Sequence, residues 1–186
     1  TVIELAGKRV LVVGLARTGM ATALFCAARG ARVTATDERA ESELRDAAEK
    51  LSAAGCALEL GSHREKTFLK QDLIVPSPGV PYALPALVAA RAKGIPVWSE
   101  IELASRFLAG RLVAITGSNG KTTTTSLLGH ILQKAGMPAL VAGNIGVPLI
   151  SRVETTSDST VTVAEVSSFQ LENIAALRPD VGVLLN

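Results

Sequence analysis

Short runs of β-branched and other apolar residues alternate along the chain with longer alanine-rich segments of helical period. Strands of a buried parallel sheet are nearly continuous apolar runs, and the connection between two of them is usually a helix. The pattern therefore predicts an α/β fold with a Rossmann-like, doubly wound parallel sheet whose ligands collect at the carboxyl ends of the strands. In the first half of the chain, the expected strands are 9–13, 32–36, 57–60, 72–75 and 95–98.

A second α/β unit is expected to follow the capping-box sequence SEIE at 99–102, which starts a helix running to about Leu108. Ala109 and Gly110 are interpreted as a hinge, so the predicted domains are 1–108 and 109–186. Because the second unit is short for a phosphate-loop (P-loop) domain, we expect a fragment. Its expected elements are strands 112–116, 139–142, 160–166 and 181–185, a helix over 121–135, and a helix from the capping box SSFQ at 167–170 to Pro179.

Composition narrows the class of protein. The chain is 48% hydrophobic and 19% charged, with 19 basic and 17 acidic residues for a net charge of +2, and the charges are dispersed. This balance gives no electrostatic footprint for nucleic acid. No apolar stretch approaches the ~18 residues of a membrane span, and we find no signal-peptide core. We expect a cytoplasmic, monomeric protein in which Cys26 and Cys56 are reduced thiols.

The segment TGSNGKT at 116–122 has the composition of a phosphate cradle between a strand and a helix. Backbone N–H groups at a helix start point outward, the helix dipole favours anions, and glycines allow close approach. Lys121 supplies a charge for outer phosphates, and the Thr122 hydroxyl can bind Mg²⁺. Ile115 stands where the general pattern has its first glycine. A glycine-rich turn with a solvated lysine is the alternative.

Two further polar residues follow strands of the same unit. Glu165 lies at the end of an apolar strand, where a parallel sheet presents side chains to the ligand edge, so it is a candidate metal ligand. Asn144 in GNIG at 143–146 can reach the same edge. A capping or salt-bridged glutamate and a simple turn asparagine remain the alternatives.

The first unit has its own glycine loop, GLARTG at 14–19, between a strand and a helix. Ala16 replaces the middle glycine of the dinucleotide fingerprint, and its methyl group weakens an NAD interpretation. Diphosphate binding through the N–H groups of Arg17, Thr18 and Gly19 is the functional hypothesis, and tight strand-helix packing without a ligand is the alternative.

Residues at the ends of the next strands complete a candidate substrate site. Asp37 takes the place of an acid that binds ribose or a base edge, although it can equally form a surface pair with Arg39. Ser77 and Gly79 follow the fourth strand at the same edge, in a segment that can also be a plain turn. His63 and His130 lack acidic partners or metal spacing and are assigned no role.

These segments together resemble the Mur ligases, ATP-dependent enzymes that extend the peptide of the cell-wall precursor. The similarity spans the whole chain and rests on AITGSNGKTT at 114–123 and on EVSSFQLE at 165–172, the second being most similar to the D-glutamate-adding branch. It implies the cofactors ATP and Mg²⁺ and the substrates UDP-N-acetylmuramoyl-L-alanine and D-glutamate. A P-loop small-molecule kinase and a non-catalytic nucleotide-binding module are the rival hypotheses.

The resemblance also implies roles for individual residues. Lys121 and Asn144 would be catalytic, Asn144 also contacting the substrate end near the transferred phosphate, and Thr122 and Glu165 would hold magnesium. The carbamylated lysine, an Asp-His pair, most of the adenine pocket and the amino-acid domain of the family have no counterpart here, so we expect no ligation by this chain alone. The implied ATP residues are Gly117, Ser118, Asn119, Gly120, Lys121, Thr122 and Thr123, and the implied UDP-substrate residues are Arg17, Thr18, Asp37, Arg39, Ser77, Gly79 and Asn144.

Overall fold

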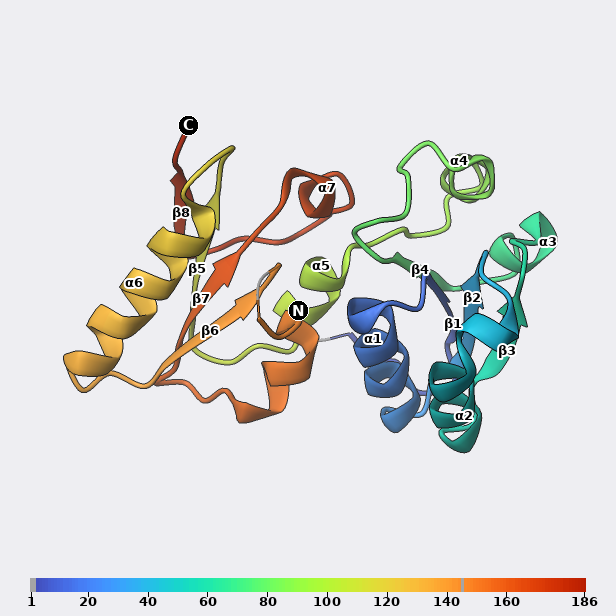
Figure 1. Cartoon of the computed structure of the whole chain (residues 1–186), viewed down its shortest axis with the longest axis horizontal. Helices are drawn as coiled ribbons and strands as arrows, with labels where there is room; N and C mark the ends of the chain where they lie inside the picture. The colour runs from blue at the N-terminus through green and yellow to red at the C-terminus, as the bar shows by residue number, and fades with distance from the viewer. Residues whose placement is uncertain (1–2, 145) are drawn as a thin grey trace. The chain divides into compact units, whose positions relative to one another are not determined.

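The computed structural model describes residues 3–144 and 146–186, and in them the chain forms two compact α/β units (Figure 1). The first comprises Ile3–Glu100 and the second Ile101–Asn186. Each contains a four-stranded parallel sheet, which confirms the predicted fold class. The units divide ahead of the expected hinge at Ala109, and the functional boundary at 108/109 remains a prediction.

The elements alternate along the chain as the hydrophobic pattern predicts. The strands are β1 (Arg9–Val13), β2 (Arg32–Asp37), β3 (Ala57–Leu60), β4 (Leu73–Pro76), β5 (Arg111–Thr116), β6 (Ala139–Gly143), β7 (Val161–Glu165) and β8 (Val181–Leu184). The helices are α1 (Arg17–Ala28), α2 (Arg45–Ala53), α3 (Glu65–Phe68), α4 (Pro85–Ala92), α5 (Glu100–Ser105), α6 (Lys121–Lys134) and α7 (Ser168–Leu171), with 3-10 helices η1 (Glu41–Glu43) and η2 (Leu149–Thr155).

The first sheet has the strand order β3-β2-β1-β4. Its central strand β1 is apolar and buried from Val10 to Val13, as expected of a parallel strand covered on both faces. Leu11 and Val13 share an apolar cluster with Leu87 of α4, while α1 contacts β1 and β2. Strands β2 and β3 lie on one side of β1, and β4 lies on the other. The carboxyl end of β1 is therefore a topological switch point of the kind that binds ligands.

The expected fifth strand at 95–98 is wrong. In the described part of the chain, this segment makes a single parallel bridge, Ile74 to Val97, with the Ile74 amide donating to the Pro96 carbonyl oxygen at 2.9 Å. Pro96 has no N–H to donate, so it cannot continue a ladder of backbone hydrogen bonds.

The second sheet has the order β6-β7-β5-β8. Val113, Ile115, Val161 and Val163 form its buried cluster, and Leu128 and Leu132 of α6 pack against that cluster. Helix α6 lies along this sheet (Figure 1). Since α6 directly follows β5, its N-terminus lies at the carboxyl end of the central strands. This topology brings the ends of β5, β6 and β7 to one edge.

Two helices of the second unit are shorter than predicted. Helix α5 ends at Ser105 rather than near Leu108, and α7 ends at Leu171 although its capping box between Ser167 and Gln170 is present. The buried Glu102 carboxylate explains the early end of α7. It accepts hydrogen bonds at 2.7 to 3.0 Å from the backbone amides of Ala175, Ala176 and Leu177. In a helix that continued through this segment, these amides would donate to helix carbonyl oxygens instead.

Both cysteines are free and buried, in agreement with the expectation of reduced thiols. Burial raises the pKa of Cys26 to about 12 and also raises the pKa of Cys56, so neither thiol is activated. Among the described residues, no helix combines the length and the apolar character that crossing a bilayer requires.

Candidate functional site

The loop between β5 and α6 is built on two glycines with left-handed backbone angles. Gly117 has φ of 141° and Gly120, the N-cap of α6, has φ of 80°, values that side-chain-bearing residues rarely adopt. Within the predicted ATP segment, Ser118, Asn119, Gly120, Thr122 and Thr123 are exposed, while Gly117 and Lys121 are half-buried. The loop therefore presents backbone and hydroxyl groups at the start of a 14-residue helix.

The Lys121 ammonium group folds over this loop. Its Nζ donates to the carbonyl oxygens of Gly117 at 2.6 Å and Ser118 at 3.0 Å. An ammonium has three N–H donors, and these bonds use two of them. The side chain stays half-buried, so the charge is held at the mouth of the loop and is not enclosed in the core.

A buried carboxylate links the loop to the two neighbouring strands. Glu165 at the end of β7 is 2% exposed, and its Oε2 accepts a hydrogen bond from Thr122 Oγ1 at 2.8 Å. Its Oε1 accepts from Asn144 Nδ2 at 3.0 Å. The structure thus brings together Thr122, Asn144 and Glu165. In the sequence, 43 positions separate Thr122 from Glu165. Ile145, the neighbour of Asn144, lies outside the described residues.

A glycine makes this approach possible. A Cβ built on Gly143 would lie 2.3 Å from the Glu165 carbonyl oxygen, and φ at this position is 113°. The Asn144 amide donates to the same Glu165 oxygen at 2.9 Å. The end of β6 is therefore fixed against the end of β7 through main-chain contacts, which positions the Asn144 side chain.

The oxygen donors around Thr122 suit a hard divalent cation. Within the described part of the chain, no group of three or more His, Cys, Asp and Glu residues could enclose a metal. Magnesium requires no such cage, because it is usually held by one or two protein oxygens together with substrate phosphates and water. Thr122 Oγ1 and a Glu165 carboxylate oxygen, 2.8 Å apart, fit that kind of site.

Asn186 is a contact of the loop that sequence reasoning missed. Its Oδ1 accepts from the amides of Ser118 at 3.1 Å and Asn119 at 2.9 Å, which are amides of the predicted phosphate cradle. The parallel pairing of β8 with β5 brings residue 186 to this edge, since Leu185 N donates to Thr116 O. No local motif indicates this, because the contact depends on strand order.

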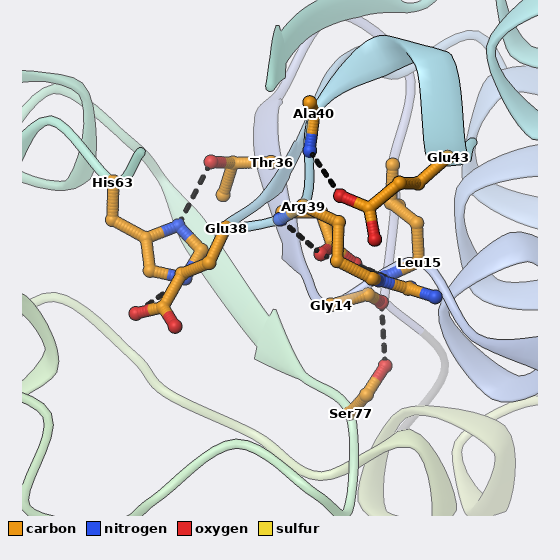
Figure 2. Close-up of polar contacts among 10 residues, drawn as sticks. Gly14, Leu15, Thr36, Glu38, Arg39, Ala40, Glu43, His63 and Ser77 are labelled. Carbon is orange, nitrogen blue, oxygen red and sulfur yellow. Dashed lines mark hydrogen bonds and ion pairs between the residues drawn. The ribbon is translucent and has the colours of Figure 1, made fainter. Parts of the chain in front are cut away.

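The glycine loop of the first unit is packed more tightly than the loop between β5 and α6. Gly14 has φ of 83°, and its carbonyl oxygen accepts from Ser77 Oγ at 2.7 Å (Figure 2). A Cβ on Gly19 would lie 1.8 Å from that same oxygen, so α1 can begin against β1 only with glycine there. Ser77 therefore fastens β4 to the loop. These contacts support the alternative interpretation of the loop, tight packing of the strand against the helix. They do not block the exposed face of the loop, where a ligand could bind.

Asp37 is the most strongly bonded acid of this edge. Its Oδ2 accepts from the Leu15 amide at 2.7 Å and from Arg39 Nη2 at 2.8 Å, and its Oδ1 accepts from the Arg39 amide at 2.9 Å. Burial alone would raise the pKa of Asp37, but hydrogen bonds from the Arg39 side chain and from the two amides lower it to about 2. Asp37 is thus ionised at neutral pH, and it ties the end of β2 to the loop after β1.

The other predicted substrate residues surround this acid. Arg17 is exposed at the start of α1, and Thr18 is half-buried, with its carbonyl oxygen accepting from Thr22 Oγ1. Gly79 is exposed and lines a cavity of about 180 Å³ together with Gly14 and Asp37. The structure therefore gathers the predicted residues at one edge of the first sheet, while their contacts with a substrate remain predictions.

His63 also belongs to this edge, although the sequence analysis assigned it no role. Its Nδ1 lies 2.9 Å from Thr36 Oγ1, and its Nε2 lies 3.8 Å from Glu38 Oε1 (Figure 2). Its place directly after β3 is the signal that could have singled it out, because it puts the ring at the carboxyl edge of the sheet.

Comparison with protein-family models identifies the class of protein. Residues 8–99 match the N-terminal domain of MurD-like Mur ligases, and residues 115–186 match the Mur ligase middle domain. The chain belongs to the Mur ligase family. The predicted resemblance is thereby confirmed.

Individual relatives narrow the position within the family. The chain is 53% identical over 184 residues to the UDP-N-acetylmuramoylalanine–D-glutamate ligase of Koribacter versatilis and 54% identical to that of Geotalea daltonii. Each alignment covers 99% of this chain and 41% of the relative, so the chain spans less than half the length of the curated relatives it matches.

Solved structures support the fold. A UDP-N-acetylmuramate:L-alanyl-γ-D-glutamyl-meso-diaminopimelate ligase from Neisseria meningitides aligns with a TM-score of 0.56 at 20% identity, over 96% of this chain and 60% of that one. A UDP-N-acetylmuramate-alanine ligase from Thermotoga maritima aligns with a TM-score of 0.52 at 21% identity, over 95% of this chain and 41% of that one.

Proposed function

We propose that this chain provides the UDP-substrate unit and part of the ATP unit of a ligase that adds D-glutamate to UDP-N-acetylmuramoyl-L-alanine, in the synthesis of the cell-wall precursor. The bonding of Glu165 to both Thr122 and Asn144 beside the Lys121 loop is the observation that carries this proposal. This edge of the second sheet presents the Lys121 ammonium group, the Asn144 amide, and two oxygens of the kind that bind a metal, from Thr122 and Glu165. The relatives' shared name supports the choice of substrates.

The reaction class follows from the chemistry of the two substrates. A carboxylate does not condense with an amine at neutral pH, because it is a poor electrophile and has no adequate leaving group. In the proposed reaction, a carboxylate oxygen of the UDP-substrate attacks the γ-phosphorus of ATP, and the bond to ADP breaks. The amine of D-glutamate then attacks the acyl carbon and loses a proton, while phosphate leaves with the former carboxylate oxygen.

The residues of the second unit would serve the first of these steps. The carboxylate and the triphosphate repel each other, and Lys121 together with the amides at the start of α6 would offset that repulsion as charge moves during transfer. Asn144 would donate to the substrate end or the transferred phosphate. A magnesium ion held by Thr122 and Glu165 would neutralise phosphate charge. Lys121 would exchange its contacts with Gly117 and Ser118 for phosphate oxygens.

The first unit would hold the UDP end of the substrate. The amides at the start of α1, including those of Arg17 and Thr18, would bind the diphosphate. Asp37 and Arg39 would contact the uridine, and Ser77 and Gly79 would line the same pocket. Because Asp37 is already bonded to Leu15 and Arg39, it would mainly position these groups. We extend the proposal to a cytoplasmic location, because the proposed reaction consumes ATP.

The test uses the full-length protein and substrate labelled with ¹⁸O in its free carboxylate. With ATP, magnesium and D-glutamate, we expect UDP-N-acetylmuramoyl-L-alanyl-D-glutamate, ADP, and phosphate that carries one ¹⁸O atom. Label in the phosphate reports the acyl phosphate directly. Product formation without transfer of ¹⁸O would contradict the mechanism, and absence of product with D-glutamate but formation with another amino acid would contradict the substrate assignment.

A further inference from the structure

The backbone amides of the loop between β5 and α6 form two groups. Helix α6 makes its first backbone hydrogen bond from the Thr124 amide to the Gly120 carbonyl oxygen, at 2.9 Å. The amides at 121–123 precede that bond, so they are among those that a helix start leaves for an anion. The amides of Ser118 and Asn119 lie further back in the loop, and both are already bonded to another part of the chain.

Asn186, which follows β8, holds both of these amides. Figure 1 shows the end of β8 beside the loop that opens α6. The Oδ1 of Asn186 accepts from Ser118 N at 3.1 Å and from Asn119 N at 2.9 Å, and its Nδ2 lies 3.5 Å from the Asn119 carbonyl oxygen. An asparagine side chain carries both an acceptor and a donor, so it can bond the N–H and C=O groups of one segment at the same time.

The backbone of the loop also lies close to the end of β8. Leu185 N donates to the Thr116 carbonyl oxygen at 3.0 Å, so the pairing of the two strands extends to the start of the loop. A Cβ built on Gly117 would lie 3.0 Å from Leu185 Cβ and 3.3 Å from the Asn186 nitrogen. Glycine at this position therefore allows the close approach that brings the Asn186 side chain to the loop amides.

Lys121 binds the opposite side of the same two peptide units. In the unit that joins Gly117 to Ser118, the N–H donates to Asn186 and the carbonyl oxygen accepts from the ammonium group at 2.6 Å. In the unit that joins Ser118 to Asn119, the N–H again donates to Asn186 and the carbonyl oxygen accepts from the ammonium group at 3.0 Å. The N–H and C=O of a planar trans peptide point in opposite directions, so a bond that fixes one of them also directs the other.

We propose that Asn186 is the positioning residue of the phosphate loop. By holding the N–H side of two peptide units, it directs their carbonyl oxygens toward Lys121 and leaves the amides at 121–123 to the phosphates. When Lys121 exchanges these carbonyl oxygens for phosphate oxygens, Asn186 keeps the loop from turning over. This inference depends on the proposed function, in which the loop binds ATP, and it gives Asn186 no contact with the nucleotide.

The first measurement separates the KM for ATP from kcat in the full-length protein. We expect Asn186→Ala to raise the KM for ATP by about tenfold, the order expected when two backbone hydrogen bonds of ordinary strength are lost. The kcat should fall by a smaller factor, because bound phosphates hold Lys121 once the complex has formed. Val181→Ala is the matched control: it shortens a half-exposed side chain at the other end of β8 and should leave both values unchanged.

The second measurement follows the loop itself. Amide hydrogen exchange over 116–123, measured by mass spectrometry without ATP, should be faster in Asn186→Ala than in the wild type. Asn186→Asp keeps an oxygen that accepts from both amides, so we expect it to restore slow exchange. This variant is used for exchange alone, because its negative charge would repel the triphosphate.

The outcomes distinguish the role of Asn186 from the proposed function. Asn186 is exposed, so its variants are expected to fold, and an unchanged Kd of the UDP-substrate checks this. An active wild type with an unchanged KM for ATP in Asn186→Ala would overturn the inference. A lower KM would also overturn it, because Asn186 would then compete with the phosphates for the loop amides. A folded wild type that forms no product with ATP and D-glutamate would contradict the proposed function itself.

Discussion

The two glycine loops of this chain have the same local plan and different chemistry. Each follows the central strand of a parallel sheet and opens a helix, and each needs glycine where backbone segments meet. In the first loop, an acid from the neighbouring strand, Asp37, already bonds the Leu15 amide and is neutralised by Arg39. In the second, Lys121 lies over the loop and the buried Glu165 holds Thr122.

Under the proposed function, this difference suits the two loops to different phosphates. In the first loop, the charge of Asp37 is balanced by Arg39, so a diphosphate can bind through backbone amides. Other groups of the protein then have to recognise the rest of the ligand. A loop with an ammonium and a carboxylate at its mouth concentrates both signs of charge, as a triphosphate with magnesium requires. In both units the loop follows a strand with neighbours on both sides, but on the side that holds two strands that neighbour is the next strand along the chain, β2, in the first sheet, and is β7, with β6 beyond it at the edge, in the second.

The largest expected effect comes from removing the cation of the second loop. In the full-length protein, Lys121→Ala should lower the rate of product formation by about 100- to 1,000-fold, because a preorganised charge opposite the transferred phosphate is lost. The Kd of UDP-N-acetylmuramoyl-L-alanine should stay within about twofold, a difference too small to reflect a lost hydrogen bond. Rates from coupled ADP release and Kd from calorimetry check this. An equal loss of both would contradict the separation of the two loops.

The next effect tests the packing of the first loop. The Cβ that Gly19→Ala adds would lie 1.8 Å from the Gly14 carbonyl oxygen, so α1 must move away from β1. We expect the free energy of unfolding to fall by about 2 to 3 kcal/mol. Urea denaturation measures it. The control is Gly182→Ala in β8, where a Cβ meets nothing within 4 Å. Similar losses in the two variants would mean that backbone freedom, not the close contact, dominates.

Glu165→Gln is expected to have a smaller and more specific effect. The amide is nearly the same size and can still bond Thr122 and Asn144, but it lacks the negative charge. We expect the magnesium concentration for half-maximal activity to rise by about tenfold, since one charged ligand is lost. Activity measured against magnesium concentration gives this value. A lower maximal rate with an unchanged magnesium requirement would argue against a metal role.

The smallest predicted effect is the acid dependence of the first unit. The pKa of Asp37 is lowered to about 2, below the value of about 3.9 of an unfolded chain. Its stabilising effect is therefore complete above pH 4 and is lost as the pH falls through 2. Because Arg39 is 46% exposed, we expect a contribution of no more than about 1 kcal/mol.

Two variants isolate this contribution. Hydrogen bonds from Arg9 lower the pKa of Asp72 to about 2 as well, so Asp72 adds a dependence of the same sign. Urea denaturation between pH 5 and pH 2 should show a weaker loss of stability in Asp37→Asn than in the wild type, and a separate weakening in Asp72→Asn. Identical pH profiles for wild type and Asp37→Asn would exclude the assignment.

Sequence reasoning predicted most strands because they depend on a local signal: apolar β-branched runs identify parallel strands. A lysine after glycines at a helix start is likewise a local signal, and it is the reason that a phosphate loop is predicted at 116–122. The position of Glu165 at a strand end was sufficient to bring it together with Thr122, because parallel strands end at one edge.

The features that were missed depend on contacts between distant segments. Helix α7 ends early because the Glu102 carboxylate, about 70 residues away, binds the amides at 175–177. The segment 95–98 fails as a strand because Pro96 limits its pairing with β4. Asn186 reaches the loop between β5 and α6 through the pairing of β8 with β5, and His63 is held at the carboxyl edge of the first sheet by its bond to Thr36. None of these contacts has a periodic or motif signature.

Under the proposed function the two glycine loops bind separate ligands, and a calorimetric titration distinguishes them. UDP-N-acetylmuramoyl-L-alanine is titrated by calorimetry into the 186-residue chain as wild type, as Lys121→Ala and as Asp37→Ala. We expect one ligand to bind per chain, with an affinity that Lys121→Ala leaves unchanged and Asp37→Ala weakens. Loss of binding in Lys121→Ala with no change in Asp37→Ala would contradict it.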